Sequence, residues 1–166
     1  RIDDKTPFAT TMCIKGANAS GKTNLLKGIF FVSNFIVESF GDKPEENIKI
    51  STFGNNKNSS FFELDFLLDE IEYNYHLEIT KTEVISEILY KKKSRKSKVF
   101  ERKLDVVIYA AKNVTELKKI KVRTNSSIIS TAVQYESKIA LKISNYFKHY
   151  HGNIHFYGMI DSNLSV

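Results

Sequence analysis

Eight consecutive residues, from Gly16 to Thr23, constrain this chain more than any other stretch. They spell Gly-Ala-Asn-Ala-Ser-Gly-Lys-Thr, which fits the phosphate-loop pattern G-x-x-x-x-G-K-[ST] at every fixed position. Glycines let the backbone come close to a ligand, so that several N–H groups can converge on one phosphate. The pattern predicts an ATP site in which Lys22 contacts the β- and γ-phosphates and the Thr23 hydroxyl binds Mg²⁺. The predicted nucleotide-binding residues are Gly16, Ala17, Asn18, Ala19, Ser20, Gly21, Lys22, Thr23 and Asn24.

The segments on either side of this loop have the pattern that a phosphate loop requires. Residues 11–14 are a short, mostly apolar run, which predicts a strand that enters the loop. From Lys22 to Phe40 apolar residues recur at helical spacing, and Gly41 follows, so we expect a helix that ends there. Such a helix points the positive end of its dipole at the phosphates.

Beyond this helix the hydrophobic pattern changes to the alternation of β-strands. Residues 48–53 alternate as a short strand does, and longer alternating runs on both sides of Asp69-Glu70 predict a hairpin. Together with the segments that follow, they predict an antiparallel meander over about residues 47–110. Its strands are expected at 62–68, 71–79, 84–90, 98–102 and 105–109.

The last third of the chain returns to a helical period. Apolar residues fall at three-to-four spacing over about 126–150, which predicts one helix, and residues 153–157 are expected to form a returning strand. No internal repeat marks a second domain.

Several of these segments resemble a known family. Gly16 to Asn24 resembles the phosphate loop of ABC-type ATPase heads, in particular the SMC, RecF and overcoming-lysogenization-defect (OLD) group, which favours Asn and Ser there and a trailing Asn. Looser matches cover nearly the whole chain, at 62–66, 73–75, 86–90, 100–102 and 143–147. The chain is therefore similar to the N-terminal part of bacterial AAA/ABC-like ATPases related to the OLD proteins.

The resemblance implies an α/β fold, namely a P-loop NTPase with the N-terminal lobe of an ABC-type head and an inserted antiparallel β-meander. It also implies ATP hydrolysis in a homodimer or higher oligomer that forms through the heads. Such ATPases are common in bacterial anti-phage and abortive-infection systems, including retron-associated ones, where the partner is an effector protein or a nuclease. In this family the Walker B carboxylates and the signature motif lie in a later lobe. Because the chain starts with Arg1 and stops abruptly at Val166, we expect residues 1–166 to be one partial head domain.

Composition narrows the classes of partner and compartment. The chain has 25 Lys and Arg against 19 Asp and Glu, a net charge of +6, which favours anionic partners such as nucleic acid. Abundant Lys, Asn and Ile are also typical of an AT-rich genome, which explains the same charge without a partner. No apolar run is long enough to span a membrane and no leader opens the chain, so we expect a cytoplasmic protein. The single cysteine, Cys13, is expected to be a small buried residue without a catalytic role.

Three other features have side chains that could take part in catalysis or bind a metal ion. Asp69-Glu70 follows an apolar run as in a Walker B motif, but the alternation on both sides favours a hairpin turn. Gln134, the only glutamine, is the candidate for the glutamine with which ABC-type heads sense Mg²⁺ and water, although its helical context favours a solvated position. His149, His151 and His155 do not complete a known metal spacing.

A basic run is the strongest sign of a nucleic-acid partner. Residues 91–98 hold six cations in eight positions, enough to contact a phosphate backbone. Such a run is typical of a solvated hairpin tip, and no aromatic residues interleave it, so a solvated tip is the favoured interpretation. The six are Lys91, Lys92, Lys93, Arg95, Lys96 and Lys98.

Two alternative functions stay open on the sequence alone. One is a DNA-repair or chromosome-type ATPase of the RecF or SMC kind, which needs a coiled coil or a DNA-binding surface, and no heptad run is present here. The other is a nucleic-acid-binding module that uses the basic hairpin and keeps a nucleotide as a structural ligand. Salt-dependent binding to nucleic acid that ATP does not change would favour the second.

Overall fold

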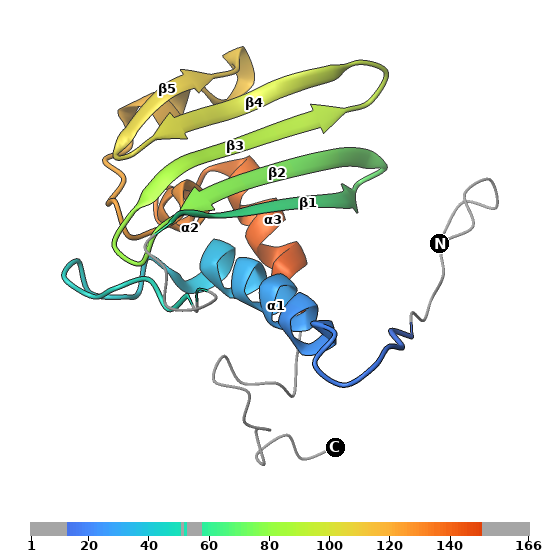
Figure 1. Cartoon of the computed structure of the whole chain (residues 1–166). Coiled ribbons are helices and arrows are strands. Elements are labelled where there is room, and N and C mark those ends of the chain that lie inside the picture. Colours follow the sequence, from blue (N-terminus) through green and yellow to red (C-terminus); the bar gives the residue numbers. More distant parts are fainter. Residues whose placement is uncertain (1–12, 51, 53–57, 151–166) are drawn as a thin grey trace.

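The computed structural model describes residues 13–50, 52 and 58–150, and a five-stranded antiparallel sheet forms its centre (Figure 1). The strands follow one another in chain order, which is the predicted meander. They are β1 (Ser60–Leu68), β2 (Ile71–Ile79), β3 (Val84–Lys92), β4 (Lys96–Lys103) and β5 (Val106–Ala110). Between β1 and β2, Asp69 and Glu70 have φ values of 50° and 60°, as in a two-residue type I′ turn. Asp69-Glu70 is therefore the tip of a hairpin.

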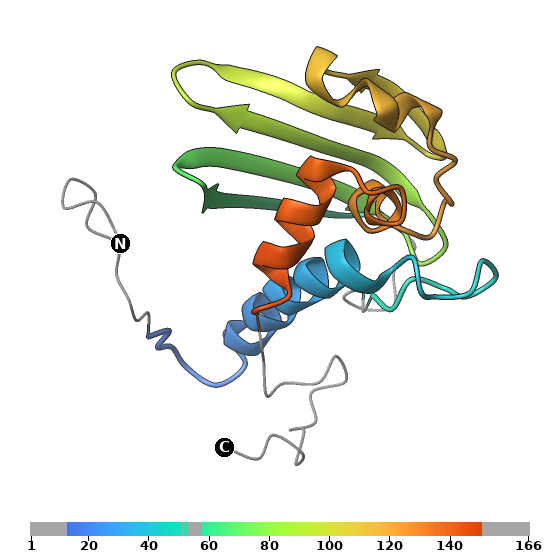
Figure 2. The same cartoon turned by 180° about the vertical axis from the view of Figure 1, so that it is seen from behind.

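The helices of the described residues lie on one side of this sheet (Figure 2). They are α1 (Lys22–Glu38), the 3-10 helix η2 (Lys112–Lys119), α2 (Ile128–Val133) and α3 (Lys138–Phe147). α1 confirms the predicted helix and packs against both α2 and α3. None of the described helices is long and apolar enough to cross a membrane.

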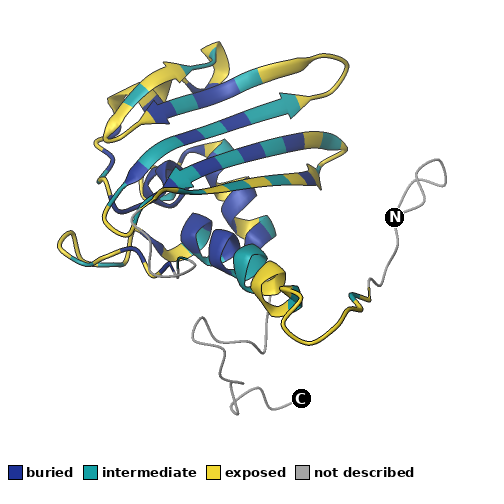
Figure 3. Ribbon diagram, viewed as in Figure 1, coloured by how far each residue is buried: buried dark blue, intermediate teal, exposed yellow. Residues whose placement is uncertain are grey.

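The hydrophobic core lies between the sheet and these helices. Along β2 the side chains alternate between buried and less buried, so that Tyr75, Leu77 and Ile79 point into the core (Figure 3). Phe66 of β1 stacks on Tyr73 and meets Phe147 of α3 edge to face, with ring centroids 5.0 Å apart. Each fully buried side chain of this size stabilises the fold by about 1.5–3 kcal/mol. None of the described helices covers the opposite face of the sheet, which we call the helix-free face.

A buried ion pair joins the sheet to α2. Glu87 of β3 and Arg102 of β4 are both fully buried, with 3.4 Å between Arg102 NH1 and Glu87 Oε2. Glu87 also accepts hydrogen bonds from the Tyr75 hydroxyl (2.8 Å), the Ser127 hydroxyl (2.7 Å) and the backbone N–H of Ile128 (2.9 Å). Burial raises the pKa of the Tyr75 hydroxyl well above its usual value, and the adjacent Glu87 carboxylate raises it further. The hydrogen bonds from Ser127 and Ile128 to Glu87 fix the start of α2.

The C-terminal end of α1 is held by the segment that precedes and begins α2. The Arg123 guanidinium donates to the carbonyl oxygens of Phe40 (2.5 Å) and Asp42 (2.8 Å). The Ser39 hydroxyl accepts the backbone N–H of Ser127 at 2.9 Å. These contacts fix one end of α1 against the sheet, and its other end carries the phosphate-loop sequence.

Two predicted strands are not found in the described residues. Cys13 and Ile14 have no strand geometry and no backbone hydrogen bond to another described segment, and Cys13 is exposed rather than buried. A strand needs a neighbour that satisfies its backbone groups, which apolar content alone does not supply. Ile48 and Ile50 are buried as an alternating strand requires, but residues 48–50 and 52 are irregular. The remaining residues of both predicted strands lie outside the described ranges, as does the predicted strand at 153–157.

The predicted helix over 126–150 is in fact two helices with a break at Gln134–Ser137. Glu136 takes a left-handed φ of 57°. Its N–H bonds the Val133 carbonyl at 3.0 Å and the Ser137 N–H bonds the Ala132 carbonyl at 3.1 Å, the pairing of a Schellman motif. The apolar residues of α2 and α3 pack into the same core, so the three-to-four spacing continues across the break and predicts a single helix. η2 was not predicted.

Candidate functional site

The loop from Gly16 to Gly21 leads directly into α1 and has the backbone features that the sequence pattern requires. A Cβ atom added to Gly16 would lie 2.8 Å from the Ser20 hydroxyl oxygen, closer than real Cβ contacts allow. Ala19 and Gly21 take left-handed φ values of 62° and 89°, which only glycine adopts without strain. The loop is thus tightly wound and closes on itself before the helix begins.

Lys22 lies over this loop. Its Nζ donates to the carbonyl oxygens of Gly16 (2.8 Å) and Ala17 (2.6 Å) and to the Ser20 hydroxyl (3.3 Å). The ammonium therefore sits inside the curve of the loop, where a phosphate would be held. To bind phosphate oxygens, it exchanges one or more of these neutral partners for charged ones, which form stronger hydrogen bonds.

The N-terminal end of α1 is free to bind an anion. α1 has 17 residues, no side chain caps its first turn and no acidic residue lies in that turn. The backbone N–H groups there have no partner within the helix, and the helix dipole favours negative charge at this end. Thr23 and Asn24 are exposed beside them. Converging donors, a lysine inside the loop and a free hydroxyl together fit a nucleotide phosphate with its Mg²⁺.

Residues 12–159 match the family model described as "AAA domain, putative AbiEii toxin, Type IV TA system". The chain belongs to this AAA-domain family. It is therefore a P-loop NTPase, and Gly16 to Thr23 has the sequence pattern of the phosphate loop. No curated protein and no solved structure matches the chain.

Gln134 of this AAA domain lies far along the fold from the phosphate loop. It is exposed and follows the last residue of α2. α2 is held to residues 37–40 through the Ser130 hydroxyl, which bonds the Phe40 N–H and the Val37 carbonyl. That is the end of α1 opposite the loop, about 25 Å away along a helix of this length. The described contacts therefore do not bring Gln134 to the loop.

Among the described residues, the acidic and histidine candidates form no hydrogen bond or ion pair with the loop. Asp69 forms an ion pair with Lys142 of α3, with 2.5 Å between the charged atoms. His149 is exposed just after α3, whereas His151 and His155 lie outside the described residues. Where the structure describes the chain, no group of three or more His, Cys, Asp or Glu side chains is placed to hold a metal ion.

The basic run forms the exposed tip between β3 and β4, as expected from its charge. Sequence analysis missed what lies beside it. Aromatic side chains of β3 and β5 lie next to the tip on the helix-free face, although none interleaves the run itself. Lys96 Nζ lies 4.6 Å from the ring centroid of Tyr90, and Lys98 Nζ lies 5.7 Å from that of Tyr109. Only the pairing of β3, β4 and β5 brings these residues together.

Proposed function

We propose that this AAA domain binds ATP with Mg²⁺ at the Gly16–Thr23 loop and hydrolyses it in a head-to-head assembly. The position of Lys22 carries the proposal, because its ammonium lies inside the curve of the loop within 2.8 Å of two loop carbonyls. In this proposal the lysine and the first-turn N–H groups of α1 bind the β- and γ-phosphates, and the Thr23 hydroxyl holds the metal. Bound Mg²⁺ supplies charge that neutralises the phosphate oxygens during transfer.

The surface next to the loop supports an assembly of heads. Residues 15–21 are all exposed, so one copy leaves the outer side of a bound nucleotide open. Leu25 and Leu26, on the first turns of α1, keep 53% and 42% of their surface exposed. Large apolar side chains at such a position favour contact with another protein surface. We propose that a second head covers this region and completes the site, and that the assembly regulates an effector protein or nuclease in a cytoplasmic defence system.

Thermal unfolding with increasing ATP and Mg²⁺ tests nucleotide binding. A ligand that binds only the folded state raises its stability, by about 2.7 kcal/mol at a concentration 100 times the Kd. We expect the melting temperature of the unmodified chain to rise with ATP–Mg²⁺ and that of the Lys22→Ala variant to stay constant. The Lys22 side chain lies on the loop surface rather than in the core, so the variant should fold normally.

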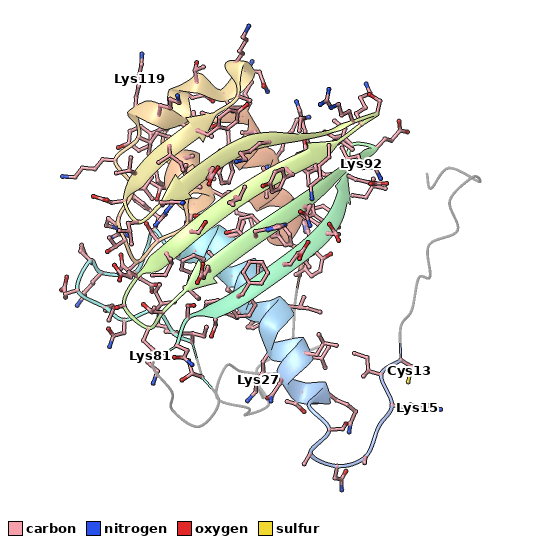
Figure 4. All side chains as sticks on the ribbon, turned by 45° about the horizontal axis from the view of Figure 1, so that its top comes forward. Cys13, Lys15, Lys27, Lys81, Lys92 and Lys119 are labelled. Atoms are coloured by element: carbon pink, nitrogen blue, oxygen red, sulfur yellow. The ribbon has the colours of Figure 1, made fainter. Side chains whose placement is uncertain are left out.

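Lys15→Ala is the matched control. Lys15 is exposed, carries the same charge and lies one residue before the loop, outside its fixed positions (Figure 4). This variant should keep the full ATP response, which separates a specific phosphate contact from general attraction by positive charge. An equal ATP response in the Lys22→Ala variant and the unmodified chain would refute the assigned site.

A further inference from the structure

The helix-free face of the sheet carries a row of rings that crosses it from one edge to the other. Phe61 of β1 meets His76 of β2 with centroids 5.7 Å apart, and His76 meets Tyr90 of β3 at 5.4 Å. Lys98 of β4 continues the row, with its Nζ 5.9 Å from the Tyr90 ring and 5.7 Å from the Tyr109 ring of β5. Four rings, one each from β1, β2, β3 and β5, and Lys98 of β4 thus form what we call the aromatic row. It spans about 19 Å at the usual strand spacing.

The rings at the two ends of the row are open to solvent. Phe61 keeps 60% of its surface exposed and Tyr109 keeps 41%. All described helices cover the opposite face of the sheet, so these rings are not part of the core (Figures 1 and 2). Flat exposed rings on an open sheet face offer stacking surfaces for the bases of a single strand, since every base has a π-face.

The basic tip next to this row has unpaired positive charge. Lys92 is paired with Glu72 and Lys98 with Glu101. In the part of the chain that the structure describes, Lys91, Lys93 and Arg95 form no ion pair. Lys91 lies opposite the buried Tyr73 of β2, on the core face, and is half-buried, whereas Lys93 and Arg95 are exposed at the tip. Two neighbouring exposed cations without a counter-charge are the electrostatic pattern that attracts a phosphate backbone.

Most carboxylates of the same face lie on β1 and β2, and Glu101 of β4 is paired with Lys98. The Asn74 amide donates to Glu63 (2.9 Å) and to Asp65 (2.8 Å), both on β1. Glu78 of β2 accepts the Ser59 hydroxyl at 2.7 Å. Negative charge therefore collects near β1 and β2, whereas positive charge collects at the β3–β4 tip. A bound strand would have its phosphates at the tip and its bases along the aromatic row.

We propose that the helix-free face of the sheet binds single-stranded nucleic acid, with stacking on Phe61, Tyr90 and Tyr109 and phosphate contacts from Lys93 and Arg95 at the tip. A single strand fits better than a duplex because the bases of a duplex are already stacked on each other. This surface lies on the β-strands rather than at the Gly16–Thr23 loop, so the proposal does not depend on ATP binding.

Fluorescence anisotropy with labelled single strands of twelve thymidines or twelve uridines, without nucleotide, tests the proposal on the 166-residue chain. We expect binding that weakens as salt rises, and weaker binding to a duplex of the same length. Replacing Lys93 and Arg95 by Ser should lower the slope of log K against log salt by about 1.4, from about 0.7 per lost contact on a single strand. The control variant replaces the exposed Lys118 and Lys119 of η2 by Ser, because η2 lies on the helix-covered side of the sheet (Figure 2).

A second pair of variants tests the stacking. Tyr109→Ser should weaken single-strand binding by about 5- to 150-fold, the usual effect of losing one stacked base. Tyr135→Ser is the matched control, since Tyr135 is 58% exposed but lies in the turn between α2 and α3. The proposal is overturned if neither oligonucleotide binds, if duplex binds as tightly as single strand, or if Tyr109→Ser and Tyr135→Ser behave alike. Failure of ATP to bind Lys22 would leave all of these outcomes unchanged.

Discussion

At the scale of single residues, the phosphate loop depends on backbone conformations more than on packing. Gly21 has a φ of 89°, and a Cβ added there would meet nothing within 4 Å. Substituting Gly21 therefore lowers the free energy of unfolding only by the strain of a left-handed L-residue, with no added steric clash. Gly28 is the opposite case, because it lies inside α1, and an added Cβ would make an ordinary contact 3.7 Å from the Phe62 ring.

The two glycines should respond in opposite directions to alanine. Gly21→Ala should lower the free energy of unfolding by about 1 kcal/mol, since an L-residue is strained at this φ. Gly28→Ala should raise it by about 0.5–1 kcal/mol, because alanine restricts the unfolded chain and favours the helix. Urea unfolding without nucleotide measures both changes. A stabilising Gly21→Ala would show that the loop does not hold the described conformation.

At the scale of elements, the sequence predicted those whose pattern is local. The five strands follow from alternation, and the Asp69-Glu70 turn follows from its place between two alternating runs. α1 follows from helical spacing bounded by the loop. Period-2 and period-3.6 patterns encode such segments directly, because each depends on residues within a few positions.

The elements that the sequence did not predict depend on contacts between distant segments. The break after α2 has Glu136 where a left-handed helix end usually has glycine, so no residue type marks it. Ser127 and Glu87 fix the start of α2 from 40 residues apart. The aromatic row likewise brings together residues from Phe61 to Tyr109. Local patterns carry no information on such pairings, although they do predict a phosphate loop at Gly16–Thr23.

The buried pair of Glu87 and Arg102 should be the most sensitive ionic contact in the described structure. Arg102→Met removes the partner of a fully buried carboxylate and leaves the Ser126 and Leu104 carbonyls without their donor. We expect a loss of about 3–5 kcal/mol in the free energy of unfolding. Lys142→Met, which removes an exposed ion pair with Asp69, should cost less than about 1 kcal/mol.

Urea unfolding of both variants measures this difference, and Arg102→Lys provides a variant that keeps the charge. Lysine cannot reproduce the forked donors that reach three carbonyl groups, so this variant should lie between Arg102→Met and the unmodified chain. Equal losses for Arg102→Met and Lys142→Met would mean that the buried pair does not hold α2 to the sheet.

At the scale of the whole molecule, two surfaces with different chemistry lie on different parts of the fold. The phosphate loop begins α1, below the edge of the sheet, and the aromatic row with the basic tip lies on the helix-free face (Figure 1). Because the two surfaces are separate, ATP binding and strand binding can be measured separately on one chain. The segment from Arg123 to Ser130 lies between α1 and the sheet: it holds the C-terminal end of α1, and Glu87 and Arg102 hold this segment to β3 and β4.

Phosphoryl transfer needs more groups than phosphate binding does. Lys22 and Thr23 supply a charge and a metal ligand, but an attacking water must also be oriented by a suitable side chain. Among the described residues, the first turn of α1 has no acidic residue, and Asp69 and Glu70 lie at a hairpin tip where Asp69 pairs with Lys142. The proposed nucleotide site therefore has no acidic residue in the first turn of α1 that could orient the attacking water.

We accordingly expect the 166-residue chain to bind ATP–Mg²⁺ but to release phosphate no faster than its Lys22→Ala variant. Phosphate release is measured at several protein concentrations, because a site completed by a second copy would give a specific activity that rises with concentration. Glu70→Gln is the decisive variant. Phosphate release that exceeds that of Lys22→Ala and disappears in Glu70→Gln would place the catalytic carboxylate on the hairpin. Release that persists in Glu70→Gln would equally contradict the expectation and would place that group elsewhere in the chain.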